Sequence, residues 1–303
     1  KGWANDELVD SENGNYDYLM YADLDFKHPD VIKNLYDWAR WFIETTGIQG
    51  FRLDAVKHID SFFMANFIRD ILQEYGDDFY VFGEFWNNDE AANNDYLENI
   101  DYRFDLVDVK LHTNLFEASQ KGDEFDLRTI FDHTLVKNHP ESAVTFVENH
   151  DTQRGQALES TVEEWFKPAA YALILLRESG LPCIFYGDYY GINGEFAQQD
   201  FREEIDKLLD LRLNLAYGEE TDYFDDPNCI GWTRAGQEGS QPIAVLISNA
   251  TSTSKRMYFG QDWSGHECSD YLGNCQTIVT IDEEGWGEFP VEEQSVSVWS
   301  IKN

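Results

Sequence analysis

The sequence predicts an α/β fold with parallel strands, either a (β/α)8 barrel or an open sheet, followed by an antiparallel all-β domain. Three observations support this prediction. Short apolar segments alternate with helix-period segments between residues 31 and 216, which is the order of βαβ units. Acidic residues stand at the ends of several apolar segments, where such folds place their reactive groups. After Tyr217, short strand-like segments are separated by Gly, Asn and Asp turns.

The α/β part can be followed element by element. A first helix is predicted at residues 30–45, because apolar side chains recur there at helical spacing after His28-Pro29, and Gly47 ends it. Strands are predicted at residues 50–56, 79–85, 104–109, 142–149 and 183–188. Further helices are predicted at residues 61–75, 111–120, 126–137, 201–216 and, in spite of Pro168, 161–178.

The last part of the chain has a strand pattern throughout. Strands are predicted in the segments CIGWTR, IAVLISN, KRMYFG, TIVTI and SVSVWSI, which are bounded by turn residues. Antiparallel strands of this kind commonly pack as a sandwich. The chain is therefore expected to divide into an irregular Asp- and Asn-rich segment at residues 1–30, the α/β part at residues 31–216, and a β-sandwich at residues 217–303.

The chain is strongly acidic, and this narrows the classes of partner. Twenty-two Lys and Arg residues against 58 Asp and Glu residues give a net charge of −36. Such a surface repels nucleic acids and anionic membranes, and no apolar run reaches the roughly 18 residues that a transmembrane helix needs. Hydrophobic residues make up 42% of the chain, which is enough for a large core, so the acidity does not indicate disorder.

Four cysteines are too few to indicate a disulfide-stapled fold. Cys183 lies in the apolar run LPCIFYG, so a buried thiol is expected there. Cys268 and Cys275 flank the turn-like segment SDYLGN and could bridge a hairpin. The low cysteine content favours a cytoplasmic location over secretion without deciding between them.

Three acidic residues lie at the ends of predicted strands: Asp54 in GFRLDAVKH, Glu84 in VFGEFW and Asp151 in FVENHD. A single acid there is most simply part of a structural ion pair, because an unpaired buried charge is costly. Three acids that converge on one edge of a sheet indicate a reaction site instead. Arg52 lies on the same face of its strand as Asp54 and would keep that carboxylate ionised.

Aromatic residues flank Glu84 in the sequence. Apolar surroundings favour the protonated form of a carboxyl group, so Glu84 is expected to donate a proton while Asp54 stays ionised. One ionised and one protonated carboxyl group form the pair that cleaves a glycosidic bond. The sequence therefore predicts glycoside hydrolysis at this site.

The motifs GFRLDAVKH, GEFW and FVENHD resemble, in order and separation, three motifs of the α-amylase family, glycoside hydrolase family 13. The segments ENGNYDYLMYADLD and LESTVEEWFKPAAYALILLRESGLP are similar to bacterial liquefying α-amylases and their intracellular relatives. This resemblance implies endo-acting, retaining hydrolysis of α-1,4-glucosidic bonds in starch, glycogen and maltooligosaccharides. It implies that Asp54 is the nucleophile, Glu84 the acid/base, and Asp151 the third acid that stabilises the transition state.

The same resemblance implies further substrate contacts. Arg52 and His150 match residues that orient the reacting sugar. Lys57 and His58 match a contact to the glucose on the leaving side. Trp86 is placed to stack on a sugar ring, although packing in the core is an equally simple role for a tryptophan.

Closely spaced acids near the N-terminus indicate a metal site. Asp17, Asp23 and Asp25 lie in NYDYLMYADLD, and oxygen ligands in an irregular loop suit Ca²⁺, although a surface turn uses Asp in the same way. The resemblance implies that Asp17, Asp23 and the backbone carbonyl of His58 bind calcium, and that Asp25 binds a second metal ion nearby. Residues 1–30 would then be the end of an inserted metal-binding loop domain.

The resemblance also implies that the chain carries only part of the family's barrel. Strands one to three and the Asn-His motif that follows strand three have no counterpart here, so strands four to eight and a C-terminal β domain are expected. Five strands do not close a barrel. We therefore expect a preceding segment or a partner chain to supply strands one to three.

Other functions remain open at this stage. A transglycosylase or an α-1,6-glucan hydrolase of the same family would share the three acids. A non-catalytic glucan-binding protein would need none of them. A metal-dependent phosphatase or an aldolase on the same barrel would need phosphate-binding basic residues or a strand lysine, and the sequence offers no such pattern.

Overall fold

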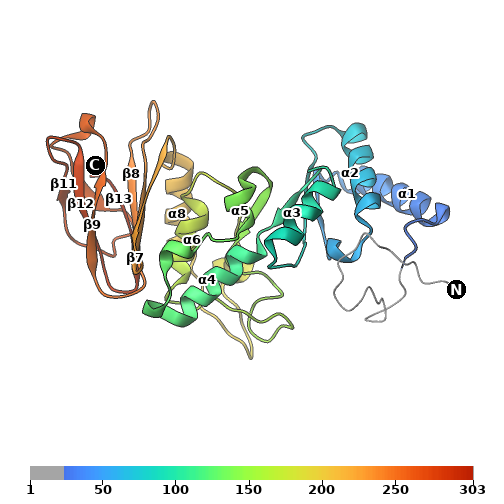
Figure 1. Ribbon diagram of the computed structural model, residues 1–303, viewed down its shortest axis with the longest axis horizontal. Helices are drawn as coiled ribbons and strands as arrows, with labels where there is room; N and C mark the ends of the chain where they lie inside the picture. Colours follow the sequence, from blue (N-terminus) through green and yellow to red (C-terminus); the bar gives the residue numbers. More distant parts are fainter. Residues whose placement is uncertain (1–23, 303) are drawn as a thin grey trace.

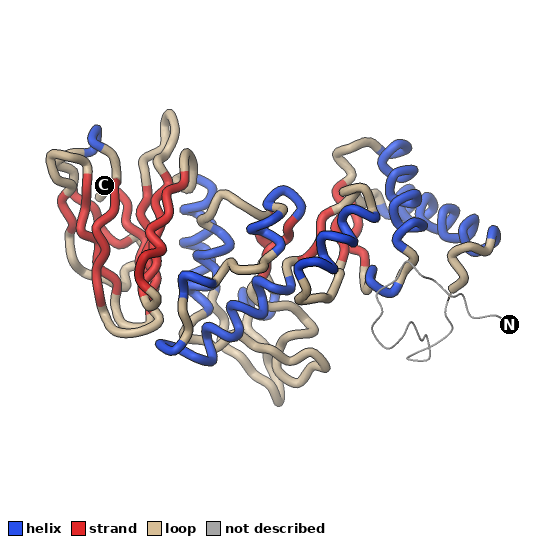
Figure 2. The backbone as a smooth tube through the Cα atoms, viewed as in Figure 1, coloured by secondary structure: helices blue, strands red, loops and turns tan. Residues whose placement is uncertain are grey.

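The structure of the protein, a computed structural model, describes residues 24–302. These residues form an elongated molecule with the first helices at one end and the last strands at the other (Figure 1). Figure 2 shows that helices and strands are interleaved along the first part, whereas strands dominate the last part. None of the described helices has both the length and the apolar character needed to cross a bilayer.

Five parallel strands form one sheet in the order β1-β2-β3-β4-β5. They are β1 (Gly50–Leu53), β2 (Tyr80–Gly83), β3 (Asp105–Val107), β4 (Ala143–Phe146) and β5 (Leu181–Cys183). A spatial order that follows the chain order is that of consecutive units in a (β/α)8 barrel, and this confirms the predicted fold class. The described sheet is open, with β1 and β5 as its edges.

Helices connect the strands and flank the sheet. α1 (Pro29–Thr46) and α2 (Ser61–Tyr75) match the first two predicted helices. The His28 side chain accepts a hydrogen bond from the Asp30 N–H at 3.2 Å, and Gly47 ends α1 with a φ of 69°, a left-handed conformation that suits glycine. The remaining helices are α3 (Glu90–Asn99), α4 (Val109–Lys121), α5 (Leu135–Asn138), α6 (Lys167–Leu175), α7 (Tyr186–Tyr190) and α8 (Arg202–Asn214).

Two predicted helices are much shorter in the structure. α6 begins only at Lys167, because Pro168 occupies its first turn, where the missing N–H of proline costs no hydrogen bond. Residues 126–137 form a 3-10 turn at Leu127–Thr129 and then α5. His133, just before α5, has a φ of 60°, which a right-handed helix cannot contain.

The last part consists of a six-stranded antiparallel sheet, in the order β11-β10-β13-β8-β7-β6, and a two-stranded sheet of β12 and β9. The strands are β6 (Glu220–Asp226), β7 (Cys229–Arg234), β8 (Ile243–Ser248), β9 (Thr253–Tyr258), β10 (Glu267–Asp270), β11 (Val279–Thr280), β12 (Trp286–Val291) and β13 (Ser295–Ile301). Phe289 of β12 and Trp299 of β13 are fully buried, with ring centroids 5.9 Å apart. The two sheets therefore share a core, as in a sandwich.

Several strand predictions differ from the structure. β5 ends at Cys183, and the helix α7 occupies residues that were predicted to continue this strand. The strands β6, β10 and β12 were not predicted. β6 has the sequence ETDYFDD, whose acidic residues have a low preference for strands. It nevertheless pairs with β7 along most of its length. Tertiary pairing here overrides a weak local preference.

All four cysteines are free thiols. Cys183 is exposed, contrary to the prediction of a buried thiol, because it lies at the end of the edge strand β5. Cys268 and Cys275 are buried but are not bridged, so the hairpin disulfide considered from the sequence is not formed.

The α/β part and the β part are joined by contacts of Arg177, which follows α6. Its guanidinium pairs with Glu220 at 2.6 Å and Asp222 at 2.7 Å, both on β6. The same group lies 4.9 Å from the ring centroid of Phe131 and 5.4 Å from that of Trp232, within the range of cation–π attraction. These contacts hold β6 against the end of α6.

A second contact between the two parts is made by Asn249, which follows β8. Its Nδ2 donates to the carbonyl oxygens of Gly122 and Phe125, at 2.8 Å each, just beyond the end of α4. Asn249 is fully buried, so these hydrogen bonds are shielded from water and their loss would leave two carbonyl groups without this partner.

Candidate active site

The candidate site lies at the edge of the parallel sheet where the strands end. Asp54 follows β1 directly, and Glu84 follows β2. Backbone hydrogen bonds continue beyond both strands, from Glu84 N–H to Leu53 O at 2.8 Å and from Val56 N–H to Glu84 O at 3.1 Å. The two acidic residues are therefore held on neighbouring backbones at the edge where α/β barrels carry their reactive groups.

One guanidinium contacts both acids. Arg52 reaches Oδ1 of Asp54 through Nη1, and Oε1 of Glu84 through Nη2 at 3.1 Å. The Asp54 side chain is 73% exposed, whereas that of Glu84 is 9% exposed. The structure thus brings Arg52, Asp54 and Glu84 together, with one carboxylate open to solvent and the other enclosed.

The surroundings of Glu84 differ from the expectation of an apolar environment. Its Oε2 accepts a hydrogen bond from the Ala55 N–H at 3.0 Å, and Ala55 has a φ of 48° that turns the chain sharply after β1. Phe85 packs away from the site, with its ring 4.4 Å from that of Tyr96 in the core. Glu84 therefore faces hydrogen-bond donors. Phe85 lies on the other side because neighbours in sequence alternate between the two faces of a strand.

The residues just beyond the two acids form the next layer. Lys57 Nζ donates to the carbonyl oxygen of Trp86 at 3.0 Å, which links the loops after β1 and β2. Trp86 is half-buried, and its ring lies 6.3 Å from those of His112 and Phe146. His58 is exposed in the short 3-10 turn after β1. Trp86 therefore packs on one side and leaves part of its surface open.

His150 and Asp151 lie in the loop after β4. Nε2 of His150 is 3.4 Å from Oδ2 of Asp151, and the side chain of Asn149 organises the turn by accepting from the Asp151 and Thr152 N–H groups at 2.9 and 3.0 Å. β4 ends at the same edge as β1 and β2 but lies two strands beyond β2 in the sheet. The structure thus places Asp151 on the same rim, with its described contacts inside its own loop.

Sequence reasoning missed a buried ionic cluster beneath this loop. Lys167 of α6 contacts Glu148 at 2.9 Å and also contacts Asp188 of α7, and all three side chains are fully buried. The signal in the sequence is a single lysine inside the apolar stretch WFKPAAYALIL. A fully buried lysine needs a partner, so that stretch could have pointed to the cluster.

Two titratable groups near this cluster have strongly shifted pKa values. Burial, together with the neighbouring Asp188, raises the pKa of Glu148 to about 7 even though Lys167 opposes the shift. Burial and the nearby Lys167 lower the pKa of His112 to about 4. Both shifts follow from the cost of holding a charge away from water.

The expected metal ligands are only partly covered by the structure. Asp17 and Asp23 lie outside the described residues. Asp25 is exposed, and its Oδ1 accepts from the Lys27 N–H at 3.0 Å. Within residues 24–302, no group of three or more His, Cys, Asp or Glu side chains is close enough to hold a metal ion. The expected donors are all oxygens, which is the chemistry that Ca²⁺ prefers.

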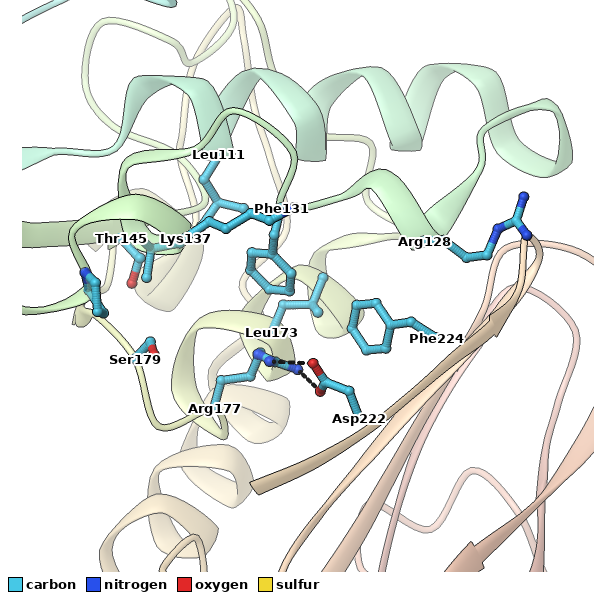
Figure 3. Close-up of a pocket in the computed structure, with 12 residues that line it drawn as sticks. Leu111, Arg128, Phe131, Lys137, Thr145, Leu173, Arg177, Ser179, Asp222 and Phe224 are labelled. Carbon is cyan, nitrogen blue, oxygen red and sulfur yellow. Dashed lines mark hydrogen bonds and ion pairs between the residues drawn. The ribbon is translucent and has the colours of Figure 1, made fainter. Parts of the chain in front are cut away.

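A separate cavity of about 290 Å³ lies at the junction between the two parts of the molecule (Figure 3). Phe131 and Phe224 stack in its lining with ring centroids 6.3 Å apart, and Arg177 and Asp222 pair at its side (Figure 3). Its walls include none of the acids at the strand ends. This cavity is therefore distinct from the candidate active site.

The chain matches two protein-family models. Residues 1–240 match the family described as "Alpha amylase, catalytic domain", and residues 243–300 match the family described as "Alpha-amylase C-terminal". A likeness of fold is seen with the crystal structure of an Anoxybacillus α-amylase, with a TM-score of 0.71 and 22% sequence identity, covering 93% of this chain and 65% of that one.

Curated relatives are similar along the whole of this chain. The glucan 1,4-alpha-maltohexaosidase of Bacillus sp. (strain 707) is 47% identical over 304 residues, which cover 100% of this chain and 58% of that protein. The alpha-amylase of Geobacillus stearothermophilus is 46% identical over 301 residues, covering 99% of this chain and 54% of that protein. The chain thus spans a little over half the length of these two relatives.

Proposed function

The chain belongs to the α-amylase family, glycoside hydrolase family 13, and from this premise we propose that the protein cleaves internal α-1,4-glucosidic bonds of starch, glycogen and maltooligosaccharides with retention of configuration. One observation carries the proposal. A single guanidinium, that of Arg52, contacts an exposed Asp54 and an enclosed Glu84 at the ends of neighbouring parallel strands. Two carboxyl groups in different environments are what a retaining glycosidase requires.

In the proposed reaction, Asp54 attacks the anomeric carbon and Glu84 donates a proton to the departing glycosidic oxygen. A water molecule then gives up a proton to Glu84 and releases the sugar from Asp54, so that both residues return to their starting states. The exposure of Asp54 supports its role as the attacking group. The enclosed position of Glu84 beside Asp54, at the end of the neighbouring strand, supports its role as the acid.

The other residues on the rim are proposed to bind the substrate. Asp151 and His150 would hold hydroxyl groups of the reacting sugar, and the hydrogen bonds of Asp151 would strengthen as positive charge develops on the ring. Lys57 and His58 follow Asp54 closely and would contact the glucose on the leaving side. Trp86 is only half-buried, which supports stacking of its ring on a sugar face.

Calcium is proposed as a structural ion of the acidic segment that precedes α1. Asp17, Asp23 and the carbonyl group of His58 would hold it, and Asp25 would bind a second metal ion. Such ions supply positive charge that ties acidic loops together. The position of His58 in the 3-10 turn that follows β1 supports this assignment, since a bound ion would link the acidic segment to the chain next to Asp54.

Further β/α units are proposed to complete the barrel, from a preceding segment or from a partner chain. The edge strands β1 and β5 each have one side without a described neighbour. Tyr80 is 39% exposed on β2, and Leu181 is 47% exposed on β5. Apolar side chains on sheet strands are normally covered, and three more strands would bring the sheet to the eight of a closed barrel. The boundary between the barrel and the β-sandwich is proposed to lie between α8 and β6.

The test of the proposed function is glucan hydrolysis by the full-length protein and its variants. With amylose as substrate, the first products are expected as α-anomers by proton NMR, and Glu84→Gln is expected to lower kcat by about 10²–10⁴-fold. Asp54→Asn is expected to lower it at least as much, because the covalent step is lost. Glucosyl transfer or cleavage of pullulan at α-1,6 bonds would instead favour another member of the family.

A matched control is provided by Asp101→Asn. Asp101 is as exposed as Asp54 and pairs with Arg103 two residues away at 2.5 Å, so it repeats the local arrangement of Arg52 and Asp54 outside the site. Its variant is expected to retain wild-type activity. β-Anomeric products, or an Asp54→Asn variant as active as this control, would overturn the proposal.

A further inference from the structure

The buried cluster around Lys167 is more elaborate than one ion pair. Asp188 also accepts hydrogen bonds from the Tyr171 hydroxyl and from Gln198 Nε2, each at 2.6 Å. Lys167, Asp188 and Tyr171 have no exposed surface, and Gln198 is buried. The cluster therefore contains one cation, two carboxyl groups including Glu148, and two neutral donors, all buried.

Stability alone is a weak explanation for such a cluster. Removing charged groups from water costs several kcal/mol for each ion, and a well-packed apolar core is often as stable as a buried ion pair. Directional contacts are what a buried polar network adds, because every donor and acceptor must keep its geometry. The relevant question is which segments of the chain these contacts hold.

One branch of the network leads to the backbone of Asp151. Oε1 of Glu148 accepts from the Thr152 hydroxyl at 2.9 Å, and the same hydroxyl oxygen accepts from the Asn149 N–H at 2.9 Å. Asn149 Oδ1 in turn accepts from the Asp151 N–H at 2.9 Å. A continuous series of contacts thus runs from the Lys167 ammonium to the residue proposed as the third acid.

The other branch leads to the loops after β5. Asp188 lies in α7, which follows β5 directly, and Gln198 lies in the loop after α7. Lys167 itself lies in the first turn of α6, the helix between β4 and β5. One buried ammonium therefore connects the segments that follow two neighbouring strands at the edge where the candidate site lies.

We propose that Lys167 is a positioning residue of the active site, whose contacts with Glu148 and Asp188 hold the β4 loop so that Asp151 and His150 face the reacting sugar. This inference rests on the proposed function, because it assigns a purpose to the geometry of Asp151. Lys167 is fully buried and therefore has no access to substrate. It acts on Asp151 through Glu148, Thr152 and Asn149.

The test compares Lys167→Met with Arg177→Met in the full-length protein. Arg177 is the matched control, since it is a mostly buried cation with two carboxylate partners at the junction with β6. Both variants are expected to lower the thermal midpoint. At a temperature where circular dichroism shows both folded, Lys167→Met is expected to lower kcat by about 10- to 100-fold, the loss that follows from a misplacement of about 1 Å. Arg177→Met is expected to retain the wild-type kcat, and KM should change little in either variant.

A second measurement does not depend on catalysis. The amide protons of Asp151 and Thr152 are expected to exchange with solvent at least about 10-fold faster in Lys167→Met, because the turn that protects them is loosened. Arg177→Met should leave these rates unchanged. If the wild-type protein does not hydrolyse glucan, the proposed function fails, while the exchange rates still report whether Lys167 holds the loop.

Thr152→Val provides a variant that is nearly isosteric and keeps all the charges, for the case that Lys167→Met does not fold. It breaks the same series of contacts one step closer to Asp151, and it is expected to lower kcat and to speed exchange of the Asp151 amide in the same direction. A kcat within twofold of wild type in a folded Lys167→Met or Thr152→Val variant, or unchanged exchange at Asp151, would overturn the proposal.

Discussion

The pH dependence of stability offers a sharp test of the buried charges near the β4 loop. Glu148 and His112 both lie in this region, and burial shifts their pKa values in opposite directions, to about 7 and about 4. The groups that face Glu148 are Lys167 from α6, Asp188 from α7 and the Thr152 hydroxyl. His112 contacts Val147 O and Ser160 Oγ at 2.8 Å each. The perturbation is the change Glu148→Gln, which removes one titration and keeps the shape.

The sign of each contribution follows from proton binding. Between pH 4.5 and 7 the folded protein holds a proton on Glu148 that the unfolded chain has released, so this contribution to the free energy of unfolding falls as the pH rises. Between pH 4 and 6.5 the unfolded chain protonates His112 and the folded protein does not, so this contribution falls as the pH drops. Each shift corresponds to roughly 3 kcal/mol at about 1.4 kcal/mol per pKa unit.

The two contributions nearly cancel in the wild-type protein between about pH 4.5 and 6.5. Urea unfolding of the full-length protein at half-unit steps of pH is therefore expected to give a shallow profile from these two groups. Glu148→Gln removes the contribution of Glu148 and leaves that of His112. The free energy of unfolding of this variant, relative to that of the wild type, should therefore rise with pH by up to roughly 3 kcal/mol by pH 7. His112→Gln is the matched control and should show the opposite trend. Parallel profiles for wild type and both variants would refute the reasoning.

Two further predictions concern the junction and the metal. Asn249→Ala is expected to lower the free energy of unfolding by about 1–3 kcal/mol in urea unfolding, because the Gly122 and Phe125 carbonyl groups lose a buried donor. The kcat per folded molecule for amylose hydrolysis is expected to stay unchanged. An unchanged unfolding midpoint would contradict the role of this contact. Chelation by EDTA is expected to lower the thermal midpoint of the full-length protein, and added Ca²⁺ is expected to restore it. The thermal midpoint of an Asp17→Asn variant should change much less on either treatment. Equal changes in wild type and variant would argue against Asp17 as a ligand.

Much of the α/β part was predictable because its signals are local. α1 and α2 were predicted almost to the residue, since apolar periodicity and end signals such as Gly47 act within a few positions of the chain. The helix predicted at residues 161–178 begins only at Lys167, because Pro168, which has no N–H, fits the first turn of a helix and not its interior. β6 was missed because its residues become a strand only by pairing with β7.

The sequence by itself determined where the acidic residues fall relative to the strands, and the family motifs around Asp54, Glu84 and Asp151 could be read from it. Only the tertiary structure decided that Arg52 contacts both Asp54 and Glu84, that Phe85 turns into the core, and that Lys167 is buried against Glu148 and Asp188. The physical reason is the distance along the chain over which each feature is determined. Helix ends and side-chain alternation depend on neighbours along the chain, whereas these contacts depend on how β1, β2 and β4 are aligned and on which surfaces α6 and α7 cover.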